Sequence, residues 1–476
     1  MVMEEPLLLP SAEAKGKKWK VITWSGLTEE LKKVTYIAAP MVVVSVSQFL
    51  LQVVSEMMAG HLGELSLSGV AIANSFTTVT GFSLLFGMAD ALETLCGQAY
   101  GAEQYQKLGI YTYCSIISLI LVCFPISLLW IFVENILVLI GQDPLVSNEA
   151  GKYSVLLIPA LVAYAILQSL VRYFQTQGLT LPILLSSCAT ICFHIPVCWV
   201  LVYKLELGTS GAALSVGFSY WLNVILLVIY IKYSSSCEKT RVPFSVDVLK
   251  SVRQFFQFGI PSAVMACLEW WSFEVLILLS GFLPNSKLET SVLSICLTTT
   301  SLHYFIPYGV SAAASTRISN ELGAGNPEAV QAAVVAAMIL AVVEAISVST
   351  ILFCCRSVLG YAFSYEKEVV DYVAALTPLL SLSVIMDSLL VVLSGIARGS
   401  GWQHVGAYLN LGAYYLVGIP LAVVLCFVLH LRGFGLWIGT LAGSIIQALL
   451  LGLVTFFTNW QKQANEARER IFEETC

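Results

Sequence analysis

Charged residues are scarce in this sequence. Only 11% of the 476 residues are Asp, Glu, Lys or Arg, whereas 58% are hydrophobic. Soluble globular domains carry about 25% charged residues, so the composition excludes an ordinary soluble fold. The chain also has no basic block interleaved with aromatic residues, which argues against nucleic-acid binding. We therefore predict an all-α polytopic membrane protein surrounded by lipid.

Patterns for metal ligands, disulfides and a leader peptide are missing as well. The five histidines form no local cluster, and the 13 cysteines show no metal-ligand spacing and no pairing within an exterior loop. We expect no metal site, no bound cofactor and no catalytic residues. The charged N-terminus predicts no cleavable signal peptide. Its string EEPLLL (Glu4–Leu9) matches an acidic dileucine sorting signal, although so short a string often occurs by chance.

Twelve apolar stretches are long enough to cross a bilayer as helices, which takes about 20 residues each. An even number of crossings places both termini on one side, and Lys and Arg are enriched on the cytoplasmic side. With the N-terminus cytoplasmic, six of the 24 basic residues fall outside: Lys152, Lys204, Lys287, Arg356, Lys367 and Arg432. We therefore predict cytoplasmic termini. The predicted spans are 34–57, 67–90, 110–133, 150–174, 182–203, 211–232, 255–282, 290–315, 329–354, 370–395, 405–428 and 435–458.

The two halves of the sequence repeat each other at an offset of about 222 residues. The matched pairs are Pro40 and Pro261, Gly60 and Gly281, Gly87 and Gly309, Gly101 and Gly323, Pro159 and Pro378, and Pro196 and Pro420. Six crossings per repeat give two bundles of one orientation, as in transporters that alternate access around a central site. The predicted division is an N-terminal tail (1–33), an N-lobe (34–233), a linker (234–251), a C-lobe (252–460) and a C-terminal tail (461–476).

Carboxylates that lie deep in the predicted spans are concentrated in the C-lobe. The span that contains Pro261 carries Glu269 and Glu274 without a basic residue. A carboxylate at membrane depth costs about 2.5–3.5 kcal/mol, and desolvation favours its neutral form. Asp387 follows Pro378 as Glu269 follows Pro261, so both acids fall at a similar depth. We predict that they share a proton-coupling site and titrate as a pair; permanently protonated packing residues are the alternative.

Other acids lie outside this predicted pair. Glu274 lies five residues after Glu269, about 140° round the helix, so we expect it to face elsewhere, with site and structural roles both open. Glu344 is expected to have a structural or secondary role. Four N-lobe acids lie near predicted span ends, where water is close: Glu56, Asp90, Glu93 and Glu134. Proton chemistry is therefore expected in the C-lobe.

Several neutral residues complete the candidate site. His303 could line its wall or lie in the core, and Asn410 could bond Asp387 or substrate. Pro261 is the predicted hinge, since proline kinks helices, although proline is common in membrane helices. Some aromatic residues could stack on a flat cation or form an interfacial belt: Trp270, Trp271, Tyr304, Tyr308, Tyr414 and Tyr415.

Five strings in the sequence resemble a known family. They are SEMMAGHLGELSLSGVAIA, GMADALETLCGQAYGA, LEWWSFE, STRISNELGAGNP and DSLLVVLSGIARGSGWQHVGAYLNLGAYYLVGIP. From about Leu31 to Trp460, the sequence resembles the multidrug and toxic compound extrusion (MATE) transporters, most closely the plant DETOXIFICATION branch. The resemblance implies twelve helices in two six-helix bundles arranged as a V, and export driven by proton antiport.

The resemblance also implies residue roles. Glu269 and Asp387 match the family's C-lobe cation-site carboxylates, and Asn410 and Tyr414 match polar positions of the span that follows Asp387. Some prokaryotic members carry a functional Asp in the first span, where this chain has Gln48 and Gln52, which puts N-lobe coupling in doubt.

These observations predict a proton-coupled antiporter that exports organic compounds from the cytosol. Organic cations, flavonoids or organic acids are expected substrates, and a monomer in the plasma or vacuolar membrane is the expected form. The alternatives are a facilitator-type carrier, a lipid or glycan flippase, and an intramembrane enzyme. A facilitator-type carrier would have several basic residues in the loop GQAYGAEQYQKLG, which contains one lysine. A flippase would need cations within the spans to bind an anionic headgroup, and an enzyme would need a nucleophile with a base or a group of metal ligands; the sequence shows neither.

Overall fold

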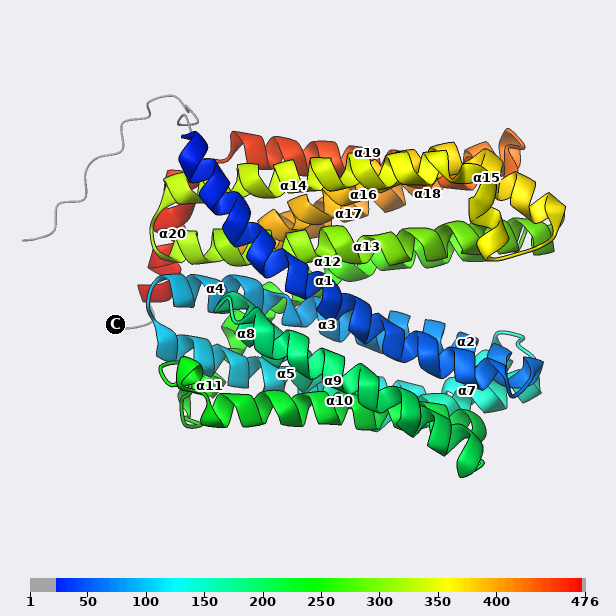
Figure 1. Cartoon of the computed structure of the whole chain (residues 1–476), viewed down its shortest axis with the longest axis horizontal. Coiled ribbons are helices and arrows are strands. Elements are labelled where there is room, and N and C mark those ends of the chain that lie inside the picture. The colour runs from blue at the N-terminus through cyan, green and yellow to red at the C-terminus, as the bar shows by residue number, and fades with distance from the viewer. Residues whose placement is uncertain (1–22, 473–476) are drawn as a thin grey trace, which may run out of the picture.

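The computed structural model describes residues 23–472, which form two helical bundles lying side by side (Figure 1). The dileucine-like string Glu4–Leu9 lies outside these residues. The N-terminal half consists of α1 (Trp24–Gly60), α2 (Glu64–Thr77), η1 (Thr78–Phe82), α3 (Ser83–Ala89), α4 (Ala91–Gly101), α5 (Tyr105–Ile131), α6 (Val133–Leu139), α7 (Pro144–Leu156), α8 (Ile158–Thr176), α9 (Thr180–Trp199), η2 (Val200–Lys204) and α10 (Gly208–Tyr233). The linker holds η3 (Ser235–Cys237) and α11 (Asp247–Lys250).

The C-terminal half repeats this arrangement. Its elements are α12 (Val252–Ser280), α13 (Ser286–Gly323), α14 (Pro327–Cys354), α15 (Arg356–Leu359), η4 (Gly360–Ala362), α16 (Lys367–Ser400), α17 (Gln403–Asn410), η5 (Leu411–Gly418), α18 (Ile419–Val423), η6 (Val424–Val428), α19 (Arg432–Phe457) and α20 (Trp460–Phe472). The predicted C-terminal tail thus begins with a helix, α20.

Each predicted span falls on a long helical segment. Within residues 23–472, ten helices are long and apolar enough to cross a membrane, and α7 with α8, bent by 47°, makes an eleventh. The twelfth is α13, which has 38 residues but is rich in Ser and Thr and therefore less apolar. Local signals set some boundaries: Asp143 caps α7, where its Oδ1 accepts the Leu145 amide at 2.8 Å and Pro144 occupies the first turn.

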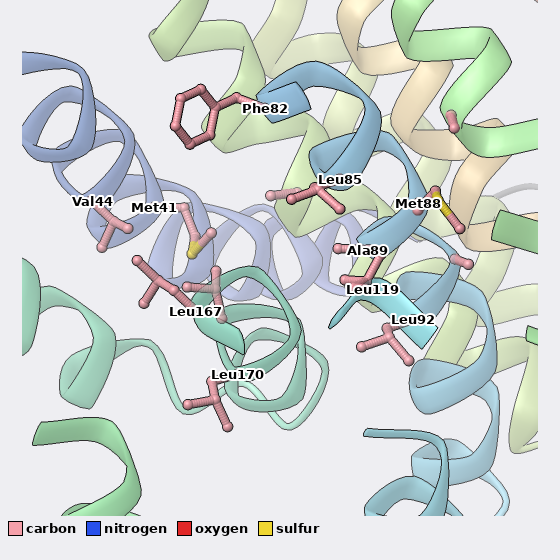
Figure 2. Close-up of a cluster of buried hydrophobic side chains, with 14 of the residues drawn as sticks. Met41, Val44, Phe82, Leu85, Met88, Ala89, Leu92, Leu119, Leu167 and Leu170 are labelled. Carbon is pink, nitrogen blue, oxygen red and sulfur yellow. The ribbon is translucent and has the colours of Figure 1, made fainter. Parts of the chain in front are cut away.

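A continuous apolar core holds the N-lobe together. Met41 and Val44 of α1 face Leu167 of α8, while Leu85 and Leu92 lie along the α3–α4 segment (Figure 2). All five side chains are buried. The same core continues into α12, α13, α14 and α16, so the two lobes are packed together over part of their length.

Two helices cross from one lobe to the other. Helix α1 packs against α13, and α12 packs against α3, in line with the internal repeat. The paired glycines permit both crossings: a Cβ at Gly309 would lie 2.8 Å from the Ala38 carbonyl oxygen, and one at Gly87 would lie 2.7 Å from Ala263 Cα. Only a residue without a side chain fits at such contacts.

The lobes also meet at the end of the molecule where α1 begins and α20 lies, which we call the terminal end (Figure 1). Helix α20 packs on α13, α14 and α4, and so touches both lobes. Its Trp460 stacks on Trp402 with ring centroids 5.5 Å apart, and Arg470 Nη1 donates to Gln98 Oε1 at 2.7 Å. The terminal end is therefore closed by contacts between lobes.

Candidate functional site

A cavity of about 450 Å³ lies between the two lobes. Its walls come from α1, η1, α3, α8 and α10 of the N-lobe and from α12, α13 and α16 of the C-lobe. This volume is typical of pockets that hold a drug-sized molecule. Any molecule bound here would contact both lobes.

Glu269 and Asp387 both line this cavity, on α12 and α16. They come from different helices but lie within electrostatic range of each other. Among residues 23–472, no Lys or Arg lies within ion-pair distance of either carboxylate. The structure therefore places the two acids that the sequence pairs by depth in one cavity, where neither forms an ion pair with a described Lys or Arg.

Glu274 also lines the cavity, which corrects the expectation that it faces elsewhere. The expectation rested on the angle of about 140° between the two residues, whereas both acids line the cavity. Glu274 accepts a hydrogen bond of 3.2 Å from the Ser75 hydroxyl on α2. It therefore joins the C-lobe to the N-lobe across the cavity.

His303 lines the cavity from α13 and is bonded within the C-lobe. Its Nε2 lies 2.7 Å from Glu344 Oε1 on α14 and 3.2 Å from Ser388 Oγ on α16. The Ser388 hydroxyl also donates to Glu344 Oε2 at 2.7 Å. Glu344, for which a structural or secondary role is expected, is thus hydrogen-bonded to a cavity residue.

Asn410 and Tyr414 are fully buried and lie behind the cavity wall. Asn410 Nδ2 donates to the Met265 carbonyl at 2.7 Å, and its Oδ1 accepts from Gln447. These partners replace the expected bond from Asn410 to Asp387 or substrate. The Tyr414 hydroxyl lies 3.2 Å from Ser444 Oγ. In this conformation both residues position α12 and α19 rather than contact the cavity.

Pro261 lies inside α12, which continues through it from Val252 to Ser280. Proline removes one backbone donor from the helix and leaves a weak point. Two residues later, Ala263 forms the close contact with Gly87 of α3. The predicted hinge is therefore adjacent to a crossing between the lobes.

Aromatic rings form one side of the cavity. Phe86 stacks on Trp270 with centroids 5.7 Å apart, and Tyr304 stacks on Tyr308 at the same distance. All four line the cavity. Trp271 does not, and its Nε1 instead donates to the Val79 carbonyl at 3.2 Å. A flat cation in the cavity would meet both acids and the faces of aromatic rings.

The N-lobe wall is polar but uncharged along α1. Gln48, Gln52 and Gln168 line the cavity, and Gln168 Nε2 donates to Gln48 Oε1 at 3.3 Å. The Gln48 amide nitrogen is buried without a hydrogen-bond partner among the described residues. Those residues also contain no group of three or more His, Cys, Asp or Glu that could hold a metal ion.

Four charged residues form a buried cluster at the terminal-end side of the cavity. Arg172 Nη2 donates to Asp90 Oδ1 at 2.5 Å, and Arg398 Nε donates to Glu93 Oε2 at 2.8 Å. Asp90 and Glu93 are 1% and 0% exposed, which corrects the expectation that water is close to them. Because Arg398 belongs to the C-lobe and the other three to the N-lobe, the cluster joins the lobes.

Sequence reasoning missed this cluster because its members come from three separate spans. The only signal is the coincidence of two acids and two arginines near the same ends of predicted spans. Gln175 strengthens the cluster, since its Nε2 donates to Glu93 Oε1 at 3.0 Å. Arg172 also lines the cavity and donates to the Tyr308 hydroxyl at 2.9 Å. The cluster therefore borders the cavity through Arg172, and its two acids and two arginines compensate each other's charge.

Known proteins with this sequence pattern identify the family. A family model described as MatE matches residues 40–200 and 261–424, one segment in each repeat. Protein DETOXIFICATION 14 of Arabidopsis thaliana is 59% identical over 446 residues, which cover 94% of this chain and 92% of that protein. Protein DETOXIFICATION 3 of the same plant is 57% identical over 472 residues, 98% of each. The chain belongs to the MatE family.

Solved MATE structures have the same fold. The crystal structure of the eukaryotic MATE transporter AtDTX14 superposes with a TM-score of 0.90 at 59% identity, covering 94% of this chain and 100% of that chain. An outward-facing multidrug resistance MATE transporter of the MOP superfamily gives 0.81 at 15% identity over 94% of this chain and 100% of that chain, and shows the fold alone.

Membership of the MatE family confirms the all-α fold in two six-helix bundles and the resemblance to the plant DETOXIFICATION branch. The chain is a MATE transporter of the detoxification type, a multi-pass membrane protein that moves small molecules out of a compartment. It is not an enzyme, and MATE transporters need no cofactor.

Proposed function

We propose that this MATE transporter is a proton-coupled antiporter that exports organic compounds, organic cations above all, from the cytosol. The observation that carries the proposal is the cavity between the lobes, which both Glu269 and Asp387 line without an ion pair to Lys or Arg. A cavity acid without an ion-pair partner can be neutralised either by a proton or by a cationic substrate. Both cannot occupy one carboxylate, so binding of one displaces the other.

The proposed cycle uses this exclusion. On the acidic side, outside the cell or in the vacuole, Glu269 and Asp387 take up a proton and release the substrate. The protein then opens at the terminal end, which we propose faces the cytosol, with α12 bending near Pro261. Loss of the proton to the cytosol recharges the acids, which bind the next substrate. Each ligand drives the exchange only by its different affinity for the two conformations.

The aromatic wall and the acids define the proposed substrates. Planar xenobiotic or metabolite cations would stack on Trp270 and Tyr304 while their charge meets Glu269. Flavonoids and organic acids, which carry no positive charge, would have to use the polar N-lobe wall. We propose that the transporter works as a monomer in the plasma or vacuolar membrane, because both lobes of the cavity come from one chain.

Proteoliposomes with an imposed pH gradient test this proposal. Wild-type protein should accumulate a fluorescent organic cation only when the gradient is present, and a sodium gradient should not replace it. Glu269→Gln and Asp387→Asn should abolish the gradient-driven uptake. Glu56→Gln is the matched control, because Glu56 is a partly buried acid bonded to Asn74 outside the cavity. Wild-type activity in both cavity variants would refute proton coupling at these acids.

A further inference from the structure

The linker between the two lobes carries basic and apolar side chains on its surface. From the end of α10 to the start of α12, residues 232–253 contain five basic residues and two acids. Phe244, Val246 and Leu249 of this segment are 64%, 71% and 60% exposed. The five basic residues are exposed as well: Lys232, Lys239, Arg241, Lys250 and Arg253. Apolar side chains that gather on a surface among polar ones mark an interaction site.

The linker is held against α5 at the terminal end (Figure 1), where α11 packs on that helix. Thr240 of the linker is buried, and its hydroxyl donates to Gln177 Oε1 at 3.0 Å and lies 2.6 Å from the Tyr173 hydroxyl. A Cβ at Gly109 of α5 would lie 2.6 Å from the Thr240 carbonyl oxygen, so the two backbones approach closely. Buried contacts therefore fix the segment that carries the exposed side chains.

The apolar part of this surface continues the outer face of α5. The ring of Phe244 lies edge-on to the ring of Tyr113 on α5, with centroids 6.0 Å apart. Tyr113 begins a row of exposed side chains at helical spacing, which continues through Leu121, Phe124 and Leu128. In a helix that crosses a bilayer, such a row faces the acyl chains. Phe244 therefore lies beside the lipid-facing surface of the N-lobe.

Basic side chains follow similar rows on the helices that flank the linker. On α10, Lys232 comes four residues after the exposed Val228, and on α12, Arg253 comes seven residues before the exposed Ile260. At 1.5 Å per residue, these spacings are about 6 and 10 Å. Lipid headgroups extend roughly 5–8 Å beyond the hydrocarbon on each side of a bilayer. Both basic side chains therefore lie near the level of the lipid phosphates.

Most of this basic charge has no acidic partner in the described part of the chain. Lys250 pairs with Asp247 at 2.8 Å. Arg241 Nη1 donates to the Lys232 carbonyl at the end of α10, which fixes the guanidinium beside this helix. Among residues 23–472, no acid lies within ion-pair distance of the four other basic residues, which are Lys232, Lys239, Arg241 and Arg253. Their charges are available to an anion from outside the protein.

From these observations we propose that the linker and the adjoining ends of α5, α10 and α12 form a binding surface for an anionic phospholipid. The acyl chains lie against Tyr113 and Phe244, and the anionic headgroup meets the basic residues. An acidic protein segment would match the charges but would leave the exposed apolar side chains beside the lipid-facing row unused. With the terminal end facing the cytosol, as proposed, the surface meets the leaflet that carries anionic lipids.

Native mass spectrometry of the detergent-solubilised full chain measures lipid binding directly. Wild-type protein should bind phosphatidylserine more tightly than phosphatidylcholine with the same acyl chains. The triple variant Lys232→Gln/Lys239→Gln/Arg253→Gln should weaken phosphatidylserine binding by about 100-fold, since each basic residue near an anionic lipid surface contributes about fivefold. It should leave phosphatidylcholine binding unchanged. Phe244→Ser should weaken the binding of both lipids, because it acts on the acyl chains.

A matched triple variant controls for the loss of charge. Lys204→Gln/Arg356→Gln/Lys367→Gln removes the same charge from exposed residues at the opposite end of the molecule, and it should bind phosphatidylserine as the wild type does. Thermal unfolding in detergent checks that each variant is folded. Glycerophosphoserine, which is the same headgroup without acyl chains, should not compete with the lipid.

The results that would overturn the proposal are distinct. Equal affinity of the wild type for the two lipids would remove the role of the basic residues, and an equal loss in the control triple variant would assign the binding to general charge. Competition by glycerophosphoserine at the concentration of the lipid would point to a soluble acidic partner instead. None of these measurements involves transport, so the proposed proton coupling and this inference can fail independently.

Discussion

Closure of the terminal end depends on two glycines that the repeat places in equivalent positions. A Cβ at Gly101 would lie 2.6 Å from the Asn320 carbonyl carbon, and one at Gly323 would lie 2.8 Å from the Gln98 carbonyl carbon. The two contacts are equivalent in the repeat, because Gly101 and Gly323 are 222 positions apart, and so are the residues that they meet, Gln98 and Asn320. We predict that Gly101→Ala and Gly323→Ala hinder this closure and favour the conformation that is open at the terminal end.

The magnitude follows from the distances. Non-bonded carbon atoms prefer separations of about 3.5–4.0 Å, so the lobes would have to part by about 1 Å at each contact. The neighbouring atoms belong to helix backbone and cannot rotate away. Overpacking of this kind costs about 1–3 kcal/mol. Since the clash exists only when the end is closed, the equilibrium should shift toward opening by about 5- to 150-fold.

Alkylation of a reporter cysteine measures this shift. Ser319 is fully buried at the closed end, beside Gly97, so Ser319→Cys should react with a maleimide only after opening. The assay uses detergent-solubilised protein in which the exposed Cys192, Cys354 and Cys355, and the terminal Cys476, are replaced. Gly101→Ala and Gly323→Ala should each raise the alkylation rate by about 5- to 150-fold.

A matched glycine controls for loss of helix flexibility. Gly452 in α19 has no atom within 4 Å of the position where a Cβ would lie. Gly452→Ala should therefore leave the alkylation rate of Ser319→Cys unchanged. If Gly101→Ala and Gly323→Ala behave like Gly452→Ala, the closed terminal end is not limited by these contacts and the reasoning is wrong.

Two further predictions concern the same end. Arg398→Gln removes the charged partner that lies 2.8 Å from Glu93, so it should destabilise the protein by about 3–5 kcal/mol. The measurement is the unfolding temperature, which should fall. Lys462→Gln is the control: it removes an exposed ion pair and should cost at most about 1 kcal/mol. Trp460→Ala removes a buried ring that stacks on Trp402, a loss of about 3–5 kcal/mol, so α20 should become sensitive to trypsin while the rest of the chain stays resistant.

The helices and the main pair of acids could be predicted from the sequence. Apolar stretches of about 20 residues leave few alternatives to crossing helices, and the spacing from Pro261 and Pro378 predicted similar depths for Glu269 and Asp387. Glu274 could not be placed, because helical angle alone does not say how far a cavity extends round a helix. Its position depends on the shape of both lobes, to which α2 contributes through Ser75.

Buried polar partners were harder to predict for a different reason. Asp90 and Arg398 are 308 positions apart in the sequence and meet only through the contact between the two lobes. Neither residue's local sequence indicates burial, since charged residues near span ends usually meet water. Asn410 illustrates the same limit: its sequence position suits a bond to Asp387, yet the fold gives it the Met265 carbonyl. Partner choice depends on tertiary contacts rather than on spacing.

The two sets of buried charges have different parts in the proposed cycle: one holds the terminal end closed and the other would bind the proton. Asp90 and Glu93 are matched by Arg172 and Arg398, so the cluster is neutral and its bonds, rather than its charge, hold the lobes together. The cavity acids have no such partners, so a proton changes the net charge there. Helix α16 carries both Asp387 and Arg398 without interruption, about 16 Å apart. In the proposed cycle, a movement of α16 that follows the charge at Asp387 also moves Arg398. Because coupling between two sites is reciprocal, contacts at the closed end then influence proton affinity in the cavity as much as protons influence closure.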